Sequence, residues 1–164
     1  MGRSGCDFLE SRMYKLKREY DIDVTVVNGE NSAQGNGITP QSYRQLLNIG
    51  ADVVTTGNHS FRRREAEELY DTNEQLLRPA NYPEGVMGHG VTYIDMCPYK
   101  IAVVNLMGTM YMEAVENPFN YVDKLLESID TPNIIVDFHA ETTSEKKAMG
   151  FYLQKRCTAV LGTH

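Results

Sequence analysis

The chain has 164 residues, 41% hydrophobic content and a formal net charge of −6, so it can bury a sizeable core, and its length suggests one domain over residues 1–164. The acidic balance argues against a protein that coats nucleic acid by neutralising phosphates, and we expect no extensive nucleic-acid-binding surface. Its three cysteines are widely spaced and form no C-x-x-C pair, which argues against a disulfide framework or a zinc ribbon and fits a reducing cytoplasm. No apolar run reaches signal-peptide length or the roughly 18 residues of a membrane span, so no membrane partner is expected.

Apolar periodicity predicts helices and strands in alternation, interrupted by one hairpin. The clearest boundaries are two cap-plus-proline signals, Thr39-Pro40 and Asn117-Pro118, which mark helix starts. In chain order the predicted elements are a helix over about 7–20, a strand over 22–27, a helix from 40 to its end at 50, a strand over 51–56, one or two helices within 62–77, a hairpin of strands over 91–96 and 100–106, a helix over 117–129, a strand over 134–138, a helix over 143–155 and a last strand over 157–161. This order predicts an α/β fold.

Polar side chains follow four of the apolar runs, at the points where the strands end. Because open α/β sheets bind ligands at the carboxyl ends of their strands, we expect these side chains to form one site. They are Glu30, Asn31, Asn58, His59, His139 and His164.

The mixture of carboxylate, amide oxygen and imidazole at these strand ends is the donor set preferred by zinc, iron or manganese. Two divalent ions about 3.5–4 Å apart can hold a phosphoryl group and activate water at neutral pH, so phosphoester hydrolysis is the favoured interpretation. His59, beside a ligating Asn58, is expected near the substrate, where it could protonate a leaving oxygen.

Five motifs in order resemble those of the bacterial YmdB-like metallophosphoesterases, which belong to the calcineurin-like superfamily. The motifs are Asn28-Gly29-Glu30-Asn31, Gly57-Asn58-His59, Arg78-Pro79-Ala80-Asn81-Tyr82-Pro83, Asp137-Phe138-His139-Ala140-Glu141 with Thr143-Ser144-Glu145-Lys146, and Gly162-Thr163-His164. The resemblance covers essentially the whole chain. It implies a four-layer α/β/β/α sandwich, a dinuclear centre of iron or manganese, and hydrolysis of cyclic nucleotides, including 2′,3′-cyclic ones.

Carried over by position, the resemblance implies a role for each strand-end residue. Glu30 is expected to bridge two metals and Asn31 to bind the first, while Asn58, His139 and His164 bind the second. His59 resembles the family's proton donor.

Two departures concern the ends of the chain. Family members begin with a strand ending in Gly-Asp, whose Asp binds the first metal, whereas Met1–Gly5 matches the loop that follows that strand. Members also continue Gly-Thr-His with Thr-His, and the second His binds the first metal. We therefore expect a chain lacking the family's first strand and C-terminal part, which holds at most one metal tightly and is poorly active. A smaller departure is Ser60-Phe61-Arg62, where the family has an aromatic residue and then Asp.

Alternative interpretations stay open. The chain could be a non-catalytic metal-binding or regulatory protein that kept the fold, or a phosphomonoesterase. Glu141, Thr142 and Thr143 are expected to cap the next helix, with lining of the substrate pocket as the alternative. The basic run Arg62–Arg64 is expected to pair with Glu65–Glu68, with steering of phosphate as the alternative. The expected partner is a small cyclic-nucleotide or phosphodiester substrate, and a homo-oligomer is left open.

Overall fold

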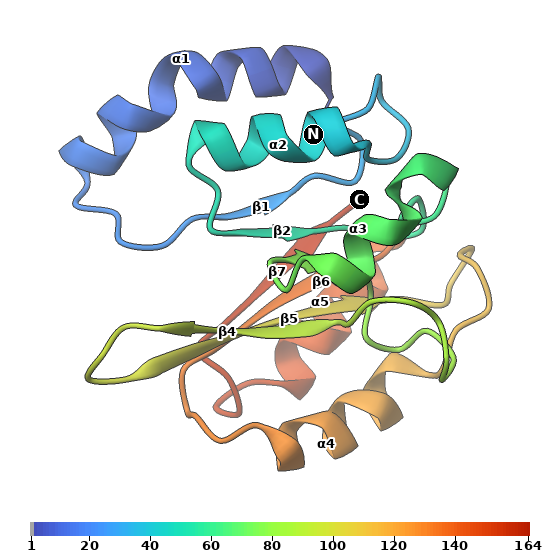
Figure 1. The fold of residues 1–164 in the computed structure, drawn as a ribbon. Helices are drawn as coiled ribbons and strands as arrows, with labels where there is room; N and C mark the ends of the chain where they lie inside the picture. Colours follow the sequence, from blue (N-terminus) through green and yellow to red (C-terminus); the bar gives the residue numbers. More distant parts are fainter. Residues whose placement is uncertain (1) are drawn as a thin grey trace.

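A computed structural model describes residues 2–164 and has four layers, with helices, sheet, sheet and helices stacked in that order (Figure 1). Helices α1 (Arg3–Glu19) and α2 (Pro40–Ile49) cover one outer face, and α4 (Pro118–Ser128) and α5 (Thr143–Tyr152) cover the other. The predicted α/β/β/α fold class is confirmed.

The first sheet has three parallel strands in the order β1 (Val26–Asn28), β2 (Val53–Thr55) and β3 (Leu76–Leu77). Between β2 and β3 the chain forms the 3-10 helix η1 (Arg64–Ala66) and the short helix α3 (Glu67–Thr72).

The second sheet is mixed, in the order β4 (Val91–Asp95), β5 (Lys100–Met107), β6 (Ile134–His139) and β7 (Ala159–Thr163). Strands β4 and β5 form the predicted antiparallel hairpin, and β5, β6 and β7 run parallel. The carboxyl ends of β5, β6 and β7 therefore lie at one edge of the sheet.

Local capping explains where the main helices begin. The Thr39 hydroxyl accepts from the Ser42 amide and Pro40 follows, and Gly50 ends α2 in a left-handed conformation. The Asn117 side chain caps α4 in the same way before Pro118. These signals lie within one turn of the residues they control, so the sequence alone predicted them.

Alternation along the strands divides the core into three clusters. In β2, Val54 packs under α1 and α2, while Val53 packs between the sheets against Leu77 and Val103. The second sheet packs its other face against α4 and α5 through residues such as Phe138. The layer between the sheets is apolar at Val53 and becomes polar toward the carboxyl ends of the strands, where the predicted site residues begin.

Several element predictions were wrong, among them the last strand, which spans Ala159–Thr163 rather than 157–161. Leu76 and Leu77 were expected on the apolar side of a helix, but they form β3, because pairing with Val54 and Thr55 buries both side chains completely. The first helix begins at Arg3 rather than near residue 7, the strand expected over 22–27 is shortened to Val26–Asn28, and α5 ends at Tyr152. A two-residue apolar pair carries no periodicity that separates a helix from a strand.

Among residues 2–164 no helix has both the length and the apolar character needed to cross a bilayer.

Candidate metal centre

The carboxyl ends of strands from both sheets face one another and bring the predicted residues to one place. Glu30 follows β1, Asn58 and His59 follow β2, His139 is the last residue of β6, and His164 follows β7. Glu30 and His139 are almost fully buried, with side chains 1% and 0% exposed, whereas the ring of His59 is 27% exposed. The arrangement thus has a buried centre and an accessible histidine beside it.

Three polar atoms converge on one ring nitrogen, Nε2 of His139. Glu30 Oε2 lies 3.0 Å from it, Asn58 Oδ1 3.1 Å and His164 Nδ1 3.3 Å. A ring nitrogen has only one proton or one lone pair in its plane, so it cannot satisfy all three neighbours by hydrogen bonding. The cluster of Glu30, Asn58, His139 and His164 is therefore short of positive charge or of donors.

This donor set fits a divalent transition metal. Donor atoms that bind one such ion at about 2.0–2.2 Å lie roughly 3.0–3.4 Å from one another, which is the spacing found around His139. Within residues 2–164 no group of three or more His, Cys, Asp and Glu side chains is arranged to hold an ion by itself. Metal binding by these residues stays a prediction.

Asn31 lies apart from this cluster. Its Oδ1 is 3.0 Å from Nδ1 of His59, so it contacts the accessible histidine. Glu30 connects the two groups, because its Oε1 accepts a hydrogen bond of 2.7 Å from the His59 amide while its Oε2 faces His139. The carboxylate is thus placed between the position expected for a first metal, beside Asn31, and the cluster around His139.

The electrostatic environment keeps Glu30 ionised. Burial by itself raises the pKa of the Glu30 carboxyl, but hydrogen bonding and the charge of His139, together with the amide of His59, outweigh burial and hold that pKa below its usual value. A buried anion of this kind is stabilised by a cation placed against it.

Sequence reasoning missed the role of Glu141. The cap of α5 is Thr142, whose hydroxyl accepts from the Glu145 amide, as one of the expected capping residues. Glu141 instead contacts the outer ring nitrogen of His164, with Oε2 2.5 Å from Nε2. The Nδ1 of His164 is then the nitrogen turned toward His139. Only a contact between residues far apart in the chain reveals this, and no local pattern predicts it.

A second missed group lies beneath His139. Asp137 is 4% exposed and accepts hydrogen bonds from Asn28, from Thr55 and from Thr163, while Thr163 Oγ1 lies 3.1 Å from Nδ1 of His139. Asp137 and His139 are two positions apart in β6, so they point to the same face of the strand. The two-residue period of a strand was a signal in the sequence from which the position of Asp137 beneath the site could have been predicted.

The basic run borders the site but is arranged differently from the expectation. Arg62 pairs with Glu113, with a distance of 3.6 Å between the charged atoms, rather than with Glu65–Glu68. Arg63 donates to the carbonyl oxygens of Asn36 and Ala33 and so fastens the loop that follows Asn31. The run therefore contributes to loop structure.

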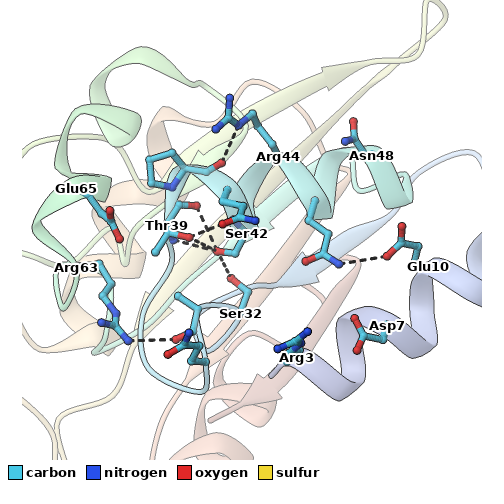
Figure 2. Close-up of a pocket in the computed structure, with 15 residues that line it drawn as sticks. Arg3, Asp7, Glu10, Ser32, Thr39, Ser42, Arg44, Asn48, Arg63 and Glu65 are labelled. Atoms are coloured by element: carbon cyan, nitrogen blue, oxygen red, sulfur yellow. Dashed lines mark hydrogen bonds between the residues drawn. The ribbon is translucent and has the colours of Figure 1, made fainter.

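A polar cavity of about 980 Å³ lies between α1, α2 and the loop around Ser32 (Figure 2). None of the predicted site residues lines it. Its walls are connected by their own hydrogen bonds, such as that between the hydroxyls of Ser32 and Ser42 and that between Gln45 and Glu10. The cavity is separate from the cluster around His139.

Comparison with known proteins agrees with the motifs. A family model described as YmdB-like protein matches residues 1–164. A relative from Bacillus subtilis, named 2′,3′-cyclic-nucleotide 2′-phosphodiesterase, is 42% identical over 166 residues, which cover 100% of this chain and 63% of the relative.

Two solved structures share the fold. A hypothetical protein from Thermus thermophilus superimposes with a TM-score of 0.94 at 36% identity, covering 100% of this chain and 64% of that one. A protein from Mycoplasma pneumoniae described as a novel phosphatase superimposes with a TM-score of 0.91 at 31% identity, covering 99% and 60%. The chain thus spans less than two thirds of the length of each of these proteins.

Proposed function

This chain belongs to the YmdB-like family, and from that membership we propose that it carries the metal centre of a phosphodiesterase that hydrolyses cyclic nucleotides of the 2′,3′ type. The Bacillus relative is named for such an activity, and the predicted chemistry of the strand ends agrees with it. The observation that carries the proposal is the convergence of Glu30, Asn58 and His164 on Nε2 of His139.

We assign one divalent ion, iron or manganese, to this cluster. Glu30 supplies a carboxylate, Asn58 a neutral oxygen, and His139 and His164 imidazole nitrogens, a mixed set suited to either metal. Bound there, the ion would supply Lewis-acid stabilisation of a phosphoryl oxygen and lower the pKa of water. Asn31 and Glu30 would help to hold a second ion if the centre is dinuclear.

The chain's own residues define how a substrate would be handled. The His139 ring and the Glu30 carboxylate form a buried floor, and His59 is the accessible histidine beside it. Nδ1 of His59 lies 3.0 Å from Oδ1 of Asn31, so Asn31 orients the ring. His59 would donate a proton to the leaving 2′ or 3′ oxygen.

The free thiols support a reducing cytoplasm as the compartment. Cys6 is buried, Cys97 is exposed and Cys157 is intermediate, and all three are unpaired with one another.

Metal binding and turnover test the proposal. The chain, freed of metal with a chelator and titrated with Mn²⁺, should bind one equivalent tightly, and His139→Ala should abolish that binding. The manganese-loaded chain, although expected to be poorly active, should then hydrolyse bis-p-nitrophenyl phosphate faster than p-nitrophenyl phosphate. Failure to bind manganese, iron or zinc would overturn the metal centre.

Variants of two histidines separate catalysis from metal binding. His59→Ala should reduce diester turnover by about 100-fold or more, the contribution of a general acid, while leaving the metal content unchanged. His89→Ala is the matched control, because the ring of His89 contacts the carbonyl oxygen of Glu74 away from the cluster. Equal loss of metal and turnover in His59→Ala would refute the acid role. Faster hydrolysis of the monoester would favour a phosphomonoesterase, and metal binding without any hydrolysis would favour a non-catalytic protein.

A further inference from the structure

The nitrogen that His139 presents to the cluster depends on a buried hydrogen-bond chain beneath it. We propose that Asp137 and Thr163 are positioning residues, which hold the proton of His139 on Nδ1 and so leave Nε2 bare toward Glu30, Asn58 and His164. This inference rests on the proposed metal centre for its purpose, although the proton position can be observed without metal.

The chain of hydrogen bonds begins at the Asp137 carboxylate. Its Oδ2 accepts from the Asn28 amide group at 3.1 Å and from the Thr55 hydroxyl, and its Oδ1 lies 2.7 Å from the Thr163 hydroxyl. An amide NH₂ can only donate, and a carboxylate can only accept. The single proton of the Thr163 hydroxyl is therefore directed to Asp137.

With its proton used, Thr163 Oγ1 can only accept from its other neighbours. These are Nδ2 of Asn28, at 3.3 Å, and Nδ1 of His139, at 3.1 Å. Nδ1 of His139 must then carry a proton for this contact to be a hydrogen bond. Were the only proton on Nε2 instead, Glu30 would gain a donor, but Thr163 would have to donate to Nδ1 and the buried Oδ1 of Asp137 would lose its donor, which costs free energy. A cation at Nε2 satisfies Glu30 without disturbing Thr163, so the proton on Nδ1 is the arrangement that serves both carboxylates.

The consequence appears on the other side of the ring. When the ring carries this one proton only, Nε2 is bare and faces the carboxylate of Glu30 at 3.0 Å and the amide oxygen of Asn58 at 3.1 Å, so lone pairs are turned toward lone pairs. That arrangement is unfavourable by itself and favourable around a cation, because every atom then acts as a ligand. The hydrogen bond from His139 that lowers the pKa of Glu30 requires a second proton, on Nε2, and a metal ion would take the place of that proton. Outer hydrogen-bond partners of ligating histidines act in this way by fixing the tautomer and the ring orientation.

The position of the ring makes the control by Asp137 and Thr163 effective. His139 is fully buried, Asp137 lies two residues before it in β6, and Thr163 is paired in register with His139 across β6 and β7. Asn28 and Thr55 come from the opposite sheet, so the Asp137 carboxylate also joins the two sheets beneath the site.

The first test reads the proton directly. The chain, labelled with ¹⁵N and kept metal-free with chelator, is examined by long-range ¹H–¹⁵N correlation at a pH where the His139 ring carries one proton, with His139→Gln to assign its signals. The proton should be found on Nδ1, and Thr163→Val should move it to Nε2. A wild-type proton on Nε2 would overturn the proposal.

The second test measures Mn²⁺ affinity by titration. Thr163→Val should weaken binding by about 10- to 100-fold, the effect of losing an outer partner of a ligating histidine, and Thr163→Ser should restore it because the hydroxyl returns. Thr55→Val is the matched control, since it removes a hydroxyl from Asp137 while leaving the contact between Thr163 and His139 in place. It should lower stability but not metal affinity.

The outcomes separate this inference from the proposed function. Equal loss of metal affinity in Thr55→Val and Thr163→Val would show a general structural effect and refute the positioning role. Manganese binding that follows the predicted order without diester hydrolysis would reject the proposed function and retain the hydrogen-bond chain. If the wild-type chain binds no metal, the proposed function fails, and the proton position still decides whether Asp137 and Thr163 control His139.

Discussion

Substitution of Gly57 by alanine would perturb the site while every ligand-type residue is kept. A Cβ added at this position would lie closer than 3.0 Å to three atoms of the His139 ring, a separation that real Cβ atoms essentially never show. The ring is fully buried and has contacts on both of its nitrogens, with Thr163 on one side and with Glu30 on the other. It cannot move aside without losing one of them.

Gly57→Ala is therefore expected to weaken both the fold and the site. Overpacking of a buried position costs about 1–3 kcal/mol in the free energy of unfolding, and we expect a loss in that range for the metal-free chain. Displacement of the His139 ring, which we propose as a ligand, should also weaken Mn²⁺ binding by at least about tenfold. Urea denaturation followed by circular dichroism measures the first effect, and Mn²⁺ titration measures the second.

Gly150→Ala is the matched control for this substitution. Gly150 lies in α5, and a Cβ there would meet no atom within 4 Å. Since alanine is favoured over glycine in a helix interior, this variant should be more stable by up to about 1 kcal/mol, with unchanged metal affinity. The packing argument is wrong if Gly57→Ala unfolds at the wild-type urea midpoint and binds manganese as the wild type does.

Two further predictions concern the packing around the site. Burial raises the pKa of Tyr70 to about 12, whereas the pKa of tyrosine in the unfolded chain is near 10. The free energy of unfolding is therefore unaffected by this group below pH 10 and falls by about 3 kcal/mol as the pH rises through 12. Tyr70→Phe should reduce the loss of stability that urea unfolding measures between pH 9 and pH 12. Part of the loss should remain, because the pKa values of other groups such as Tyr43 and Tyr82 are also raised by burial. An unchanged dependence on pH would contradict the assignment to Tyr70. Arg78 donates to five carbonyl oxygens of residues 79–88, which lysine cannot reproduce, so Arg78→Lys should lower the free energy of unfolding by about 3 kcal/mol, and a change below about 0.5 kcal/mol would show that water replaces those bonds.

Several parts of the molecule were predictable from the sequence because their signals are local. The starts of α2 and α4 follow from Thr39-Pro40 and Asn117-Pro118, and the hairpin of β4 and β5 follows from apolar runs around a proline turn. The strand-end position of the ligand-type residues was predictable for the same reason, since an apolar run and the polar group that ends it are neighbours in the chain.

Other features needed the tertiary structure because they depend on contacts between distant residues. Leu76 and Leu77 become a strand only when β2 lies beside them. Glu141 meets His164 only because β7 pairs in parallel with β6, and Asn31 contacts His59 because the residues after β1 and after β2 come together.

The difference between what the sequence determined and what the tertiary structure decided is clearest at His139. The sequence by itself determined that an imidazole ends a buried strand beside carboxylate and amide residues from other strands. Which ring nitrogen faces them was decided by Asp137 and Thr163, and through them by Asn28, 109 residues away from Asp137 in the chain. Two sheets must pack before that hydrogen-bond chain exists, and no spacing along the sequence encodes it.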